Sequence, residues 1–325
     1  MDIQRVEWAF PASNGEGDIF VRGWLIEKPR ALVQIAHGMA EHSGRYDDFA
    51  AALCSWGYSV VANDHTGHGQ SAHGTLGTFA QKPGGFDYVV EDMHKLYELV
   101  ETKTGQLPRI MMGHSMGSML AALYADRYEG IIALIMTGAP APNPMSGFAI
   151  WYANGKIKRH GYMARAPLIE KLAGSTRGLT GEELERKELW LSRDMDIVRA
   201  FIADPLCGFD FTASGFSEML SGFKVVASPD WGKKIPDIPI LIAAGGNDSV
   251  GGKGKGPARY ARQLQSTGHS DVTLKIFPDD HHEILNERDR EDVYAFIRDW
   301  LESKVIEGIV EKQDIEGQSD QEQDN

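Results

Sequence analysis

The stretch RIMMGHSMGSML, residues 109–120, places a serine between two glycines at the end of an apolar run. Residues Gly113 to Gly117 match the pattern G-x-S-x-G, in which a sharp strand-to-helix turn exposes a nucleophilic serine. Side chains at the two glycine positions would collide with neighbouring backbone, which explains why glycine is needed there. An apolar strand precedes the pattern and a helix that begins with small residues follows it, as this turn requires. Ser115 is therefore the predicted nucleophile.

Outward from this turn, short apolar runs alternate with helical patterns, which is typical of a mostly parallel sheet in an α/β protein. Residues 3–10 and 18–26 differ, because two strands joined by the turn-rich PASNGEGD predict an N-terminal antiparallel hairpin. The strands predicted after the hairpin cover 31–38, 58–64, 109–115, 131–139, 238–248 and 272–280, and the helices lie near 45–57, 85–103, 116–127, 257–267 and 287–303. These elements predict one open sheet covered by helices.

The alternation of strands and helices lapses after the strand at 131–139. The following segments are helical or irregular and rich in Trp, Phe, Met and Gly, without strand-like alternation. An insertion at this point would lie over the carboxyl edge of the sheet, where open α/β sheets bind ligands. The predicted division is a core at residues 1–140 and 231–310, a helical cap or lid at 141–230, and a disordered acidic tail at 311–325.

Composition and charge exclude several classes of protein. Of the 325 residues, 42% are apolar and 24% are charged, as in a globular protein with a sizeable core. The net charge of −13 argues against a nucleic-acid partner, because phosphate contacts need a basic face. The start of the chain has no signal-like segment, and Cys54 and Cys207 are too few for a disulfide framework. We therefore expect a cytoplasmic protein.

A serine nucleophile needs a base to accept its proton and an acid to orient that base. After a turn of this type the acid comes first along the chain and the histidine second, each on a loop after a later strand. Asp248 ends the run ILIAAGGND, and the pair His281 and His282 follows LKIFPDD. The spacing favours Asp248 and leaves both histidines open. Asp280 is a less favoured acid, because it lies so close to the histidine loop in sequence.

Acyl transfer also needs hydrogen-bond donors for the oxyanion. One is the amide of the residue after the nucleophile, Met116, and the other comes from the loop after an early strand. In HGMAEHSGRY the turn at His37 and Gly38 can aim the amide of Met39 at the nucleophile. No spacing of His, Cys, Asp or Glu matches a metal site, and GGKGKG does not match a phosphate-binding loop, so we predict neither a metal nor a cofactor.

Five stretches occur along the chain in the order HGMAEHSGRY, NDHTGHGQS, GHSMGS, GGNDSVGGKGKG and HHEILNE. Together they resemble the family of serine hydrolases that contains monoacylglycerol lipases and bacterial lysophospholipase-like proteins, within the S33 serine aminopeptidase group. The resemblance covers roughly residues 20–305 and implies the α/β-hydrolase fold, a mostly parallel sheet with an inserted helical cap. It also implies that His282, which precedes a glutamate, is the base, that Asp248 is the acid, and that Met39 and Met116 supply the oxyanion amides.

The resemblance further implies a hydrolase of monoacylglycerols, lysophospholipids or similar acyl esters, which works through an acyl-enzyme and without a cofactor. Its expected partner is a small-molecule acyl ester. A small-ester carboxylesterase and an exopeptidase are the alternatives on the same fold. An exopeptidase needs an acidic group for the substrate's amine, whereas the glutamates of the cap resemble an exposed helix face. These glutamates are Glu182, Glu183, Glu185 and Glu188.

The predicted cap begins with the aromatic and basic segment FAIWYANGKIKRHGYMAR, residues 148–165. Its cations are Lys156, Lys158, Arg159 and Arg165, without an acid. Aromatic and basic side chains together can rest on an anionic lipid surface while acyl chains enter the enzyme. One hypothesis is therefore a transient, peripheral contact of the cap with a membrane. The other is an ordinary lid helix with an apolar inner face and solvated lysines.

Overall fold

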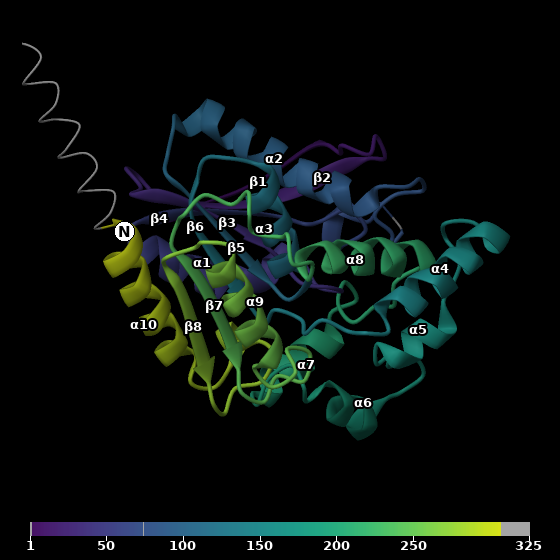
Figure 1. Ribbon diagram of the computed structural model, residues 1–325. Coiled ribbons are helices and arrows are strands. Elements are labelled where there is room, and N and C mark those ends of the chain that lie inside the picture. Colours follow the sequence, from purple (N-terminus) through teal and green to yellow (C-terminus); the bar gives the residue numbers. More distant parts are fainter. Residues whose placement is uncertain (1, 74, 307–325) are drawn as a thin grey trace, which may run out of the picture.

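The computed structural model describes residues 2–73 and 75–306 and has one large sheet at its centre (Figure 1). Within these residues eight strands pair in the order β1-β2-β4-β3-β5-β6-β7-β8. The strands are β1 (Gln4–Pro11), β2 (Asp18–Leu25), β3 (Ala31–Ala36), β4 (Tyr58–Asn63), β5 (Arg109–His114), β6 (Ile131–Thr137), β7 (Ile240–Gly245) and β8 (Val272–Phe277). β2 pairs antiparallel with β1 and β4, and the other neighbours pair parallel. The predicted mostly parallel sheet with an N-terminal hairpin is confirmed.

The N-terminal hairpin of β1 and β2 extends one edge of the sheet. The amide of Ala12 donates to Gly17 O over 3.0 Å and closes the turn between the two strands. β2 then pairs with β4, where Val21 lies opposite Asn63, although β3 follows β2 in the sequence. β3 is thereby placed between β4 and β5, next to the strand that leads to Ser115.

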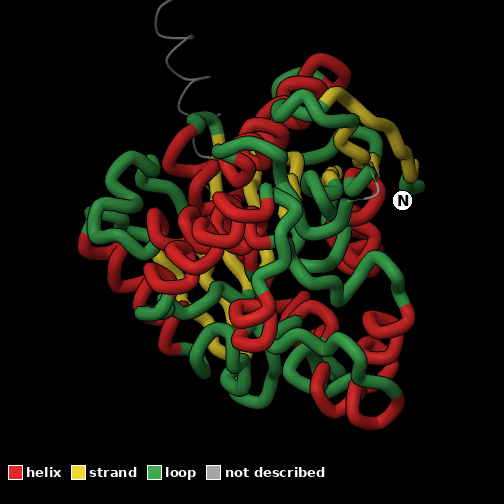
Figure 2. The backbone as a smooth tube through the Cα atoms, turned by 90° about the vertical axis from the view of Figure 1, so that its right-hand side faces the viewer, coloured by secondary structure: helices red, strands yellow, loops and turns green. Residues whose placement is uncertain are grey.

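The central strands are apolar because both of their faces are covered. Every residue of β3, β4, β5 and β7 is buried, as expected for parallel strands between two layers of helices. The helices are α1 (Asp47–Ser55) and α10 (Arg290–Leu301) on one face, and α2 (Gly85–Thr104), α3 (Met116–Arg127) and α9 (Lys255–Ser266) on the other. Figure 2 shows the strands of the sheet with helices packed around them. The predicted helices are confirmed, with end points that differ by a few residues.

Between β6 and β7 the described chain forms helices and loops but no strand. The helices are α4 (Ser146–His160), α5 (Pro167–Leu172), α6 (Gly181–Glu188), α7 (Met195–Ala203) and α8 (Ala213–Val226). We refer to α4–α8 and the loops between them as the cap. α8 packs on α3 and α4 packs on α8, and Figure 1 shows α4, α5 and α6 on the side of the molecule away from α10. The domain limits given above, with a cap at 141–230, stay a prediction.

The C-terminal end of the described chain continues α10. Residues Glu302–Ile306 follow that helix directly, and Arg30 pairs with Glu302. The tail at 311–325, which we predict to be disordered, lies outside the described residues. Among residues 2–73 and 75–306, no helix combines the length and the apolar character that are needed to cross a bilayer.

Candidate active site

Ser115 lies in a strained turn between β5 and α3. Its φ of 53° and ψ of −118° belong to a region that L side chains rarely adopt. A Cβ at Gly113 would lie 2.0 Å from Gly117 O, and a Cβ at Gly117 would lie 2.0 Å from Ala36 O. Neither position has room for a side chain, so both glycines are required for the turn. Ser115 N donates to Thr137 O over 2.8 Å and fixes the turn against β6.

Asp248 and His282 meet in the loops that follow β7 and β8. His282 Nδ1 lies 3.0 Å from Asp248 Oδ1, and both side chains are buried. Val250 N donates to the same carboxylate oxygen over 2.8 Å. Burial by itself would lower the pKa of His282, but the Asp248 carboxylate outweighs it and raises the pKa above 6.5. Burial would likewise raise the pKa of Asp248, yet His282 and nearby backbone amides hold that pKa below its usual value.

The two residues that the spacing left as alternatives point away from this contact. His281 Nδ1 donates to Leu189 O over 2.6 Å. Asp280 Oδ1 lies 2.6 Å from Arg193 Nη2. Burial and the neighbouring Asp289 raise the pKa of Asp280 to about 7. Both side chains are therefore engaged with the cap.

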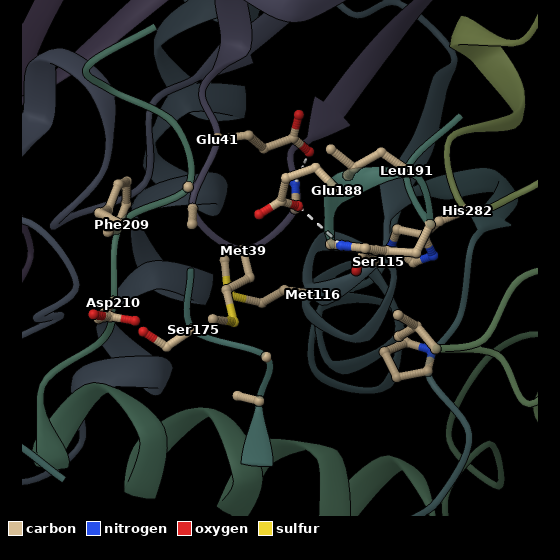
Figure 3. Close-up of a pocket in the computed structure, with 18 of the residues that line it drawn as sticks. Met39, Glu41, Ser115, Met116, Ser175, Glu188, Leu191, Phe209, Asp210 and His282 are labelled. Atoms are coloured by element: carbon tan, nitrogen blue, oxygen red, sulfur yellow. Dashed lines mark hydrogen bonds between the residues drawn. The ribbon is translucent and has the colours of Figure 1, made fainter. Parts of the chain in front are cut away.

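Three loops converge on Ser115. Ser115 and His282 line the same cavity, and Figure 3 shows them close together. A Cβ at Gly38 would lie 3.2 Å from the Cβ of Ser115, so the loop after β3 touches the serine. A Cβ at Gly138 would lie 3.1 Å from His282 Cε1, so the loop after β6 touches the histidine. The ring centroid of His114 lies 4.8 Å from that of His282. The serine, the histidine and the loop after β3 therefore surround one small volume.

The loop after β3 carries Met39, whose amide is a predicted oxyanion donor. His37 Nε2 accepts from His65 N over 2.9 Å, so the ring proton lies on Nδ1, which donates to Gly38 O over 2.8 Å. Burial lowers the pKa of His37 and keeps the ring neutral. The amide of Met39 donates no hydrogen bond to another described residue. Met116 is the first residue of α3, where amides have no acceptor within their own helix. The roles of both amides stay a prediction.

A buried ion-pair network, which the sequence analysis did not identify, connects these loops. Arg45 Nη1 lies 2.8 Å from Glu41 Oε2 and 2.6 Å from Glu283 Oε1. Burial would raise the pKa of Glu41, but Arg45 holds it at about 2. Glu41 also accepts a hydrogen bond from Gly38 N, next to Met39. The network thus ties the loop after β3 to the residue that follows the histidine pair. Its members lie in HGMAEHSGRY and HHEILNE, so charged residues inside these stretches were the available signal.

A cavity of about 250 Å³ lies beside Ser115, between the sheet and the cap. Its apolar wall comes largely from the cap and includes Phe209, Phe216, Met219 and Phe223. Figure 3 shows Phe209 on the side of the cavity away from His282. A mostly apolar lining with a few converging polar groups is typical of small-molecule sites. The arrangement has room for an apolar chain that ends at Ser115.

Glu188 departs from the exposed helix face that its sequence pattern predicts. The first glutamates of α6 are exposed as expected, but Glu188 is 6% exposed and lines the cavity. The expectation is wrong here because α6 ends at this residue and the chain turns back, with Leu191 N donating to Glu188 O over 3.0 Å. Trp190 lies in this turn, and its ring centroid is 5.1 Å from that of His282. A helical pattern could not show this, because the helix stops before the turn.

Two groups of side chains in the described chain come near the spacing of metal ligands. They are His42 with Asp204 and Cys207, and Asp280 with Glu287 and Asp289. In the first group His42 Nε2 lies 2.9 Å from Asp204 Oδ2. In the second, Arg193 pairs with all three carboxylates. His42 and the carboxylates of both groups are thus paired within the protein, and neither group includes Ser115 or His282.

Known proteins match this chain over most of its length. The family model described as Serine aminopeptidase, S33, matches residues 27–289. A monoacylglycerol lipase of Mycolicibacterium smegmatis is 30% identical over 284 residues, which cover 85% of this chain and 90% of that protein. A phospholipase of Bacillus subtilis is 23% identical over 87% of this chain and 99% of that protein. A thermostable carboxyl esterase from Bacillus coagulans, solved in complex with glycerol, superposes with a TM-score of 0.83 at 30% identity, over 94% of this chain and 99% of that one.

Proposed function

The chain belongs to the serine aminopeptidase S33 family, and on that premise we propose that it hydrolyses lipid monoesters through a triad of Ser115, His282 and Asp248. Its fold is the α/β-hydrolase fold, and its relatives identify it as a hydrolase of carboxylic esters. The proposed substrates are monoacylglycerols, lysophospholipids or similar esters of an acyl chain with a polar alcohol. A small-ester carboxylesterase is the alternative with the same chemistry.

The proposed reaction begins when Ser115 Oγ attacks the ester carbonyl carbon and its proton passes to His282 Nε2, the ring nitrogen that does not face Asp248. The carbonyl oxygen becomes an oxyanion, which the amides of Met39 and Met116 stabilise. The bond to the leaving oxygen then breaks, and His282 gives its proton to the departing alcohol. Water attacks the acyl-enzyme by the reverse route, so that Ser115 regains its proton and the carboxylic acid is released.

The observation that carries the proposal is the buried contact of Asp248 with His282 beside a serine in a strained turn. Burial of an uncompensated carboxylate is unfavourable, so a side chain such as Asp248 needs a partner that is charged or can become charged. His282 provides that partner and also lines the cavity with Ser115. The raised pKa of His282 means that the protein stabilises the imidazolium that forms when the serine loses its proton.

Steady-state hydrolysis of monoacylglycerols and p-nitrophenyl esters of increasing chain length tests the proposal. We expect kcat/KM to peak at medium or long acyl chains and kcat to fall by about 10⁶-fold in Ser115→Ala. Ser221→Ala changes an exposed serine of α8 outside the cavity, and this matched control should retain wild-type activity. Full activity in Ser115→Ala would contradict the triad. Activity confined to acetyl and butyryl esters would favour the small-ester carboxylesterase.

We also propose that α4 and α5 contact an anionic lipid surface and that the protein is cytoplasmic and peripheral. Large apolar side chains are exposed on these helices and at their ends: Met145, Phe148, Trp151, Met163, Leu168 and Leu172. Trp151 is 70% exposed and Phe148 44%, with their ring centroids 5.7 Å apart. The inner face of α4 packs on the core, as in an ordinary lid helix, but its outer face carries exposed aromatic side chains that such a helix does not need. Basic residues on the same helix complement anionic lipid headgroups.

Vesicle binding tests this contact. Reversal of Lys156, Lys158 and Arg159 to Glu should weaken binding to vesicles that contain anionic lipid, by about 1 kcal/mol for each cation removed from the surface. The matched control makes the same charge change on distant helices, at Lys95, Lys103 and Arg262. Equal binding by the two triple variants would contradict the contact, and equal hydrolysis of a water-soluble ester would show that both variants retain their fold.

An exopeptidase is the second candidate, because Glu188 places an acidic group inside the cavity. An amine at the end of a peptide could bind such a carboxylate. Turnover of an aminoacyl p-nitroanilide and of a fatty-acyl p-nitrophenyl ester separates the two candidates. Faster turnover of the ester is expected, and faster turnover of the amide would make the protein a peptidase.

A further inference from the structure

The wall of the cavity is acidic. The carboxylates that line it, among the described residues, are Glu41, Glu170, Glu188, Asp210 and Glu283, and no described lysine or arginine lines it. Arginines behind the wall neutralise most of them: Arg45 pairs with Glu41 and Glu283, and Arg165 pairs with Glu170 and Asp210. Glu188 has no arginine, lysine or histidine partner within the described part of the chain. Glu188 is therefore the lining carboxylate that lacks an ion-pair partner in residues 2–73 and 75–306, and the neighbouring Lys187 favours its charged form less than burial disfavours it.

Glu188 is held at the cavity wall by its neighbour in the turn after α6. Its Oε2 accepts a hydrogen bond from Trp190 Nε1 over 2.9 Å. Burial raises the pKa of Glu188, because the carboxylate loses contact with water. A buried carboxylate without a cation costs free energy, and a positively charged ligand would offset that cost. The position thus favours a cation that arrives with the substrate.

Trp190 connects Glu188 to the base of the proposed triad. The centroid of its ring lies 5.1 Å from that of His282, and His282 N donates to Trp190 O over 3.2 Å. The face of an indole attracts cations more strongly than any other aromatic side chain. A carboxylate and an indole therefore lie together beside His282, and these are the two kinds of group that bind ammonium ions.

The direction of proton transfer determines which part of the substrate lies beside Glu188 and Trp190. His282 gives its proton to the oxygen of the leaving alcohol, so that oxygen must lie within hydrogen-bond reach of His282 Nε2. The rest of the alcohol then extends along the wall next to His282, where Trp190 and Glu188 lie. The apolar wall at Phe209 lies on the other side of the cavity and suits the acyl chain (Figure 3).

We propose that Glu188 and Trp190 form a subsite for an ammonium group on the leaving alcohol, so that the enzyme prefers acyl esters of amino alcohols to esters of neutral alcohols of the same size. This inference rests on the proposed ester hydrolysis by Ser115 and His282. An anionic phosphate in the head group finds no cation on the described wall and meets the carboxylate of Glu188 instead. The subsite therefore selects against head groups with a net negative charge.

A pair of esters that differ only in charge tests the subsite. The choline and 3,3-dimethylbutyl esters of one medium-chain fatty acid have the same shape, but only the choline ester carries a positive charge. We expect wild-type kcat/KM to be about tenfold higher for the choline ester. In Glu188→Gln, which keeps the size of the side chain, the ratio should fall to about one. Glu182→Gln on the exposed face of α6 is the matched control and should keep the wild-type ratio.

The outcomes separate this inference from the proposed function. A wild-type ratio of one or less overturns the subsite without any variant, even if Glu188→Gln fails to fold. A high ratio that persists in Glu188→Gln overturns it too. So does a stronger preference for a cation on the acyl side, measured with aminoacyl and fatty-acyl p-nitrophenyl esters. If no ester is hydrolysed in a Ser115-dependent manner, the proposed function itself fails.

Discussion

Two parts of the cap differ in how they meet the rest of the molecule. Residues 188–193, here called the anchored strip, are bonded to the loop that carries His282, whereas α4 and α5 expose large apolar side chains to solvent. Two backbone hydrogen bonds join the strip to that loop: His282 N donates to Trp190 O over 3.2 Å, and Glu283 N donates to Leu191 O over 2.8 Å. α4, in contrast, packs one face on α8 and leaves Phe148 and Trp151 exposed.

The difference shows that the two parts of the cap are attached to the rest of the protein to different degrees. The anchored strip is hydrogen-bonded to the loop of His282, so residues such as Glu188 and Trp190 can keep a fixed position near the substrate. The part that faces outward has a surface that no described residue covers. A movement of the whole cap would break the bonds of the anchored strip, while a movement of α4 and α5 would not.

Loss of the Asp248 carboxylate, which orients His282 from the core, should have the largest effect on activity. Asp248→Asn should lower kcat by about 10⁴-fold, because the histidine loses both its orientation and the charge that stabilises its protonated form. The acid limb of the pH profile of kcat/KM should move as well. The base must be neutral to accept a proton, and Asp248 raises the pKa of His282, so we expect the wild-type limb to have its midpoint above pH 6.5. In the variant burial dominates, and the midpoint should fall below that pH.

Asp279→Asn is the matched control for this experiment, because Asp279 is an exposed carboxylate near the histidine loop. It should leave both kcat and the acid limb unchanged. Burial and the neighbouring His282 lower the pKa of His114 to about 4, so titration of that ring does not account for a limb above pH 6.5. A normal kcat with an unshifted limb in Asp248→Asn would contradict the role proposed for Asp248.

Loss of the ion pairs that join the cap to the loop of His282 should have the next largest effect. Arg193 lies 2.6 Å from Asp280 and 3.0 Å from Glu287, both of which are buried. Arg193→Gln should lower the free energy of unfolding by about 3 kcal/mol, because it leaves buried carboxylates unpaired. It should also lower kcat about tenfold, because the loop of His282 loses support from the anchored strip. Urea denaturation and steady-state kinetics measure the two effects.

The stability loss in Arg193→Gln should be larger at pH 8 than at pH 6. Burial and Asp289 raise the pKa of Asp280 to about 7 in the wild type, so above that pH the wild-type carboxylate is ionised and stabilised by Arg193. In the variant the same group must stay ionised without Arg193 or bind a proton, and either costs free energy that is not needed at pH 6. Arg199→Gln removes an exposed cap arginine that pairs with Glu185, and this control should cost less than about 0.5 kcal/mol. Equal losses in the two variants would show that the strip is not anchored through Arg193.

A smaller loss is expected where one neutral hydrogen bond of the anchored strip is removed. Ser192 Oγ donates to Asn286 O over 2.9 Å and accepts from Asp194 N over 2.9 Å. Ser192→Ala should lower the free energy of unfolding by about 1 kcal/mol in urea denaturation. The exposed Ser221→Ala should change it by less than about 0.5 kcal/mol. If both variants behave alike, the hydroxyl of Ser192 adds nothing to the strip.

The exposed part of the cap should show the smallest effect. Trp151→Ser removes a side chain that is 70% exposed, so the free energy of unfolding should change by less than about 0.5 kcal/mol. Hydrolysis of a water-soluble ester should also stay at the wild-type level. A loss of about 2 kcal/mol or more would mean that Trp151 is packed in solution, and the contrast between the two parts of the cap would disappear.

Much of the fold could be predicted because local patterns specify it. Alternation and apolar runs marked each strand of the sheet, and the pattern around Ser115 required a strained turn whose glycines have no room for a Cβ. The pairing of β2 with β4 could not be predicted in this way, because β3 and β4 have equally apolar patterns and only the packed sheet distinguishes them.

The candidate site follows the same division. The sequence by itself determined the turn at Ser115, the loop of Met39 and the two loops that supply Asp248 and the histidine pair, because sterics and short-range periodicity act between near neighbours. Only the tertiary structure decided that His282 meets Asp248 while His281 turns to the cap, and that Glu188 lies inside the cavity. These outcomes depend on which residues, distant in the sequence, pack around a side chain and exclude water from it. The local sequence carries no pattern that predicts such burial.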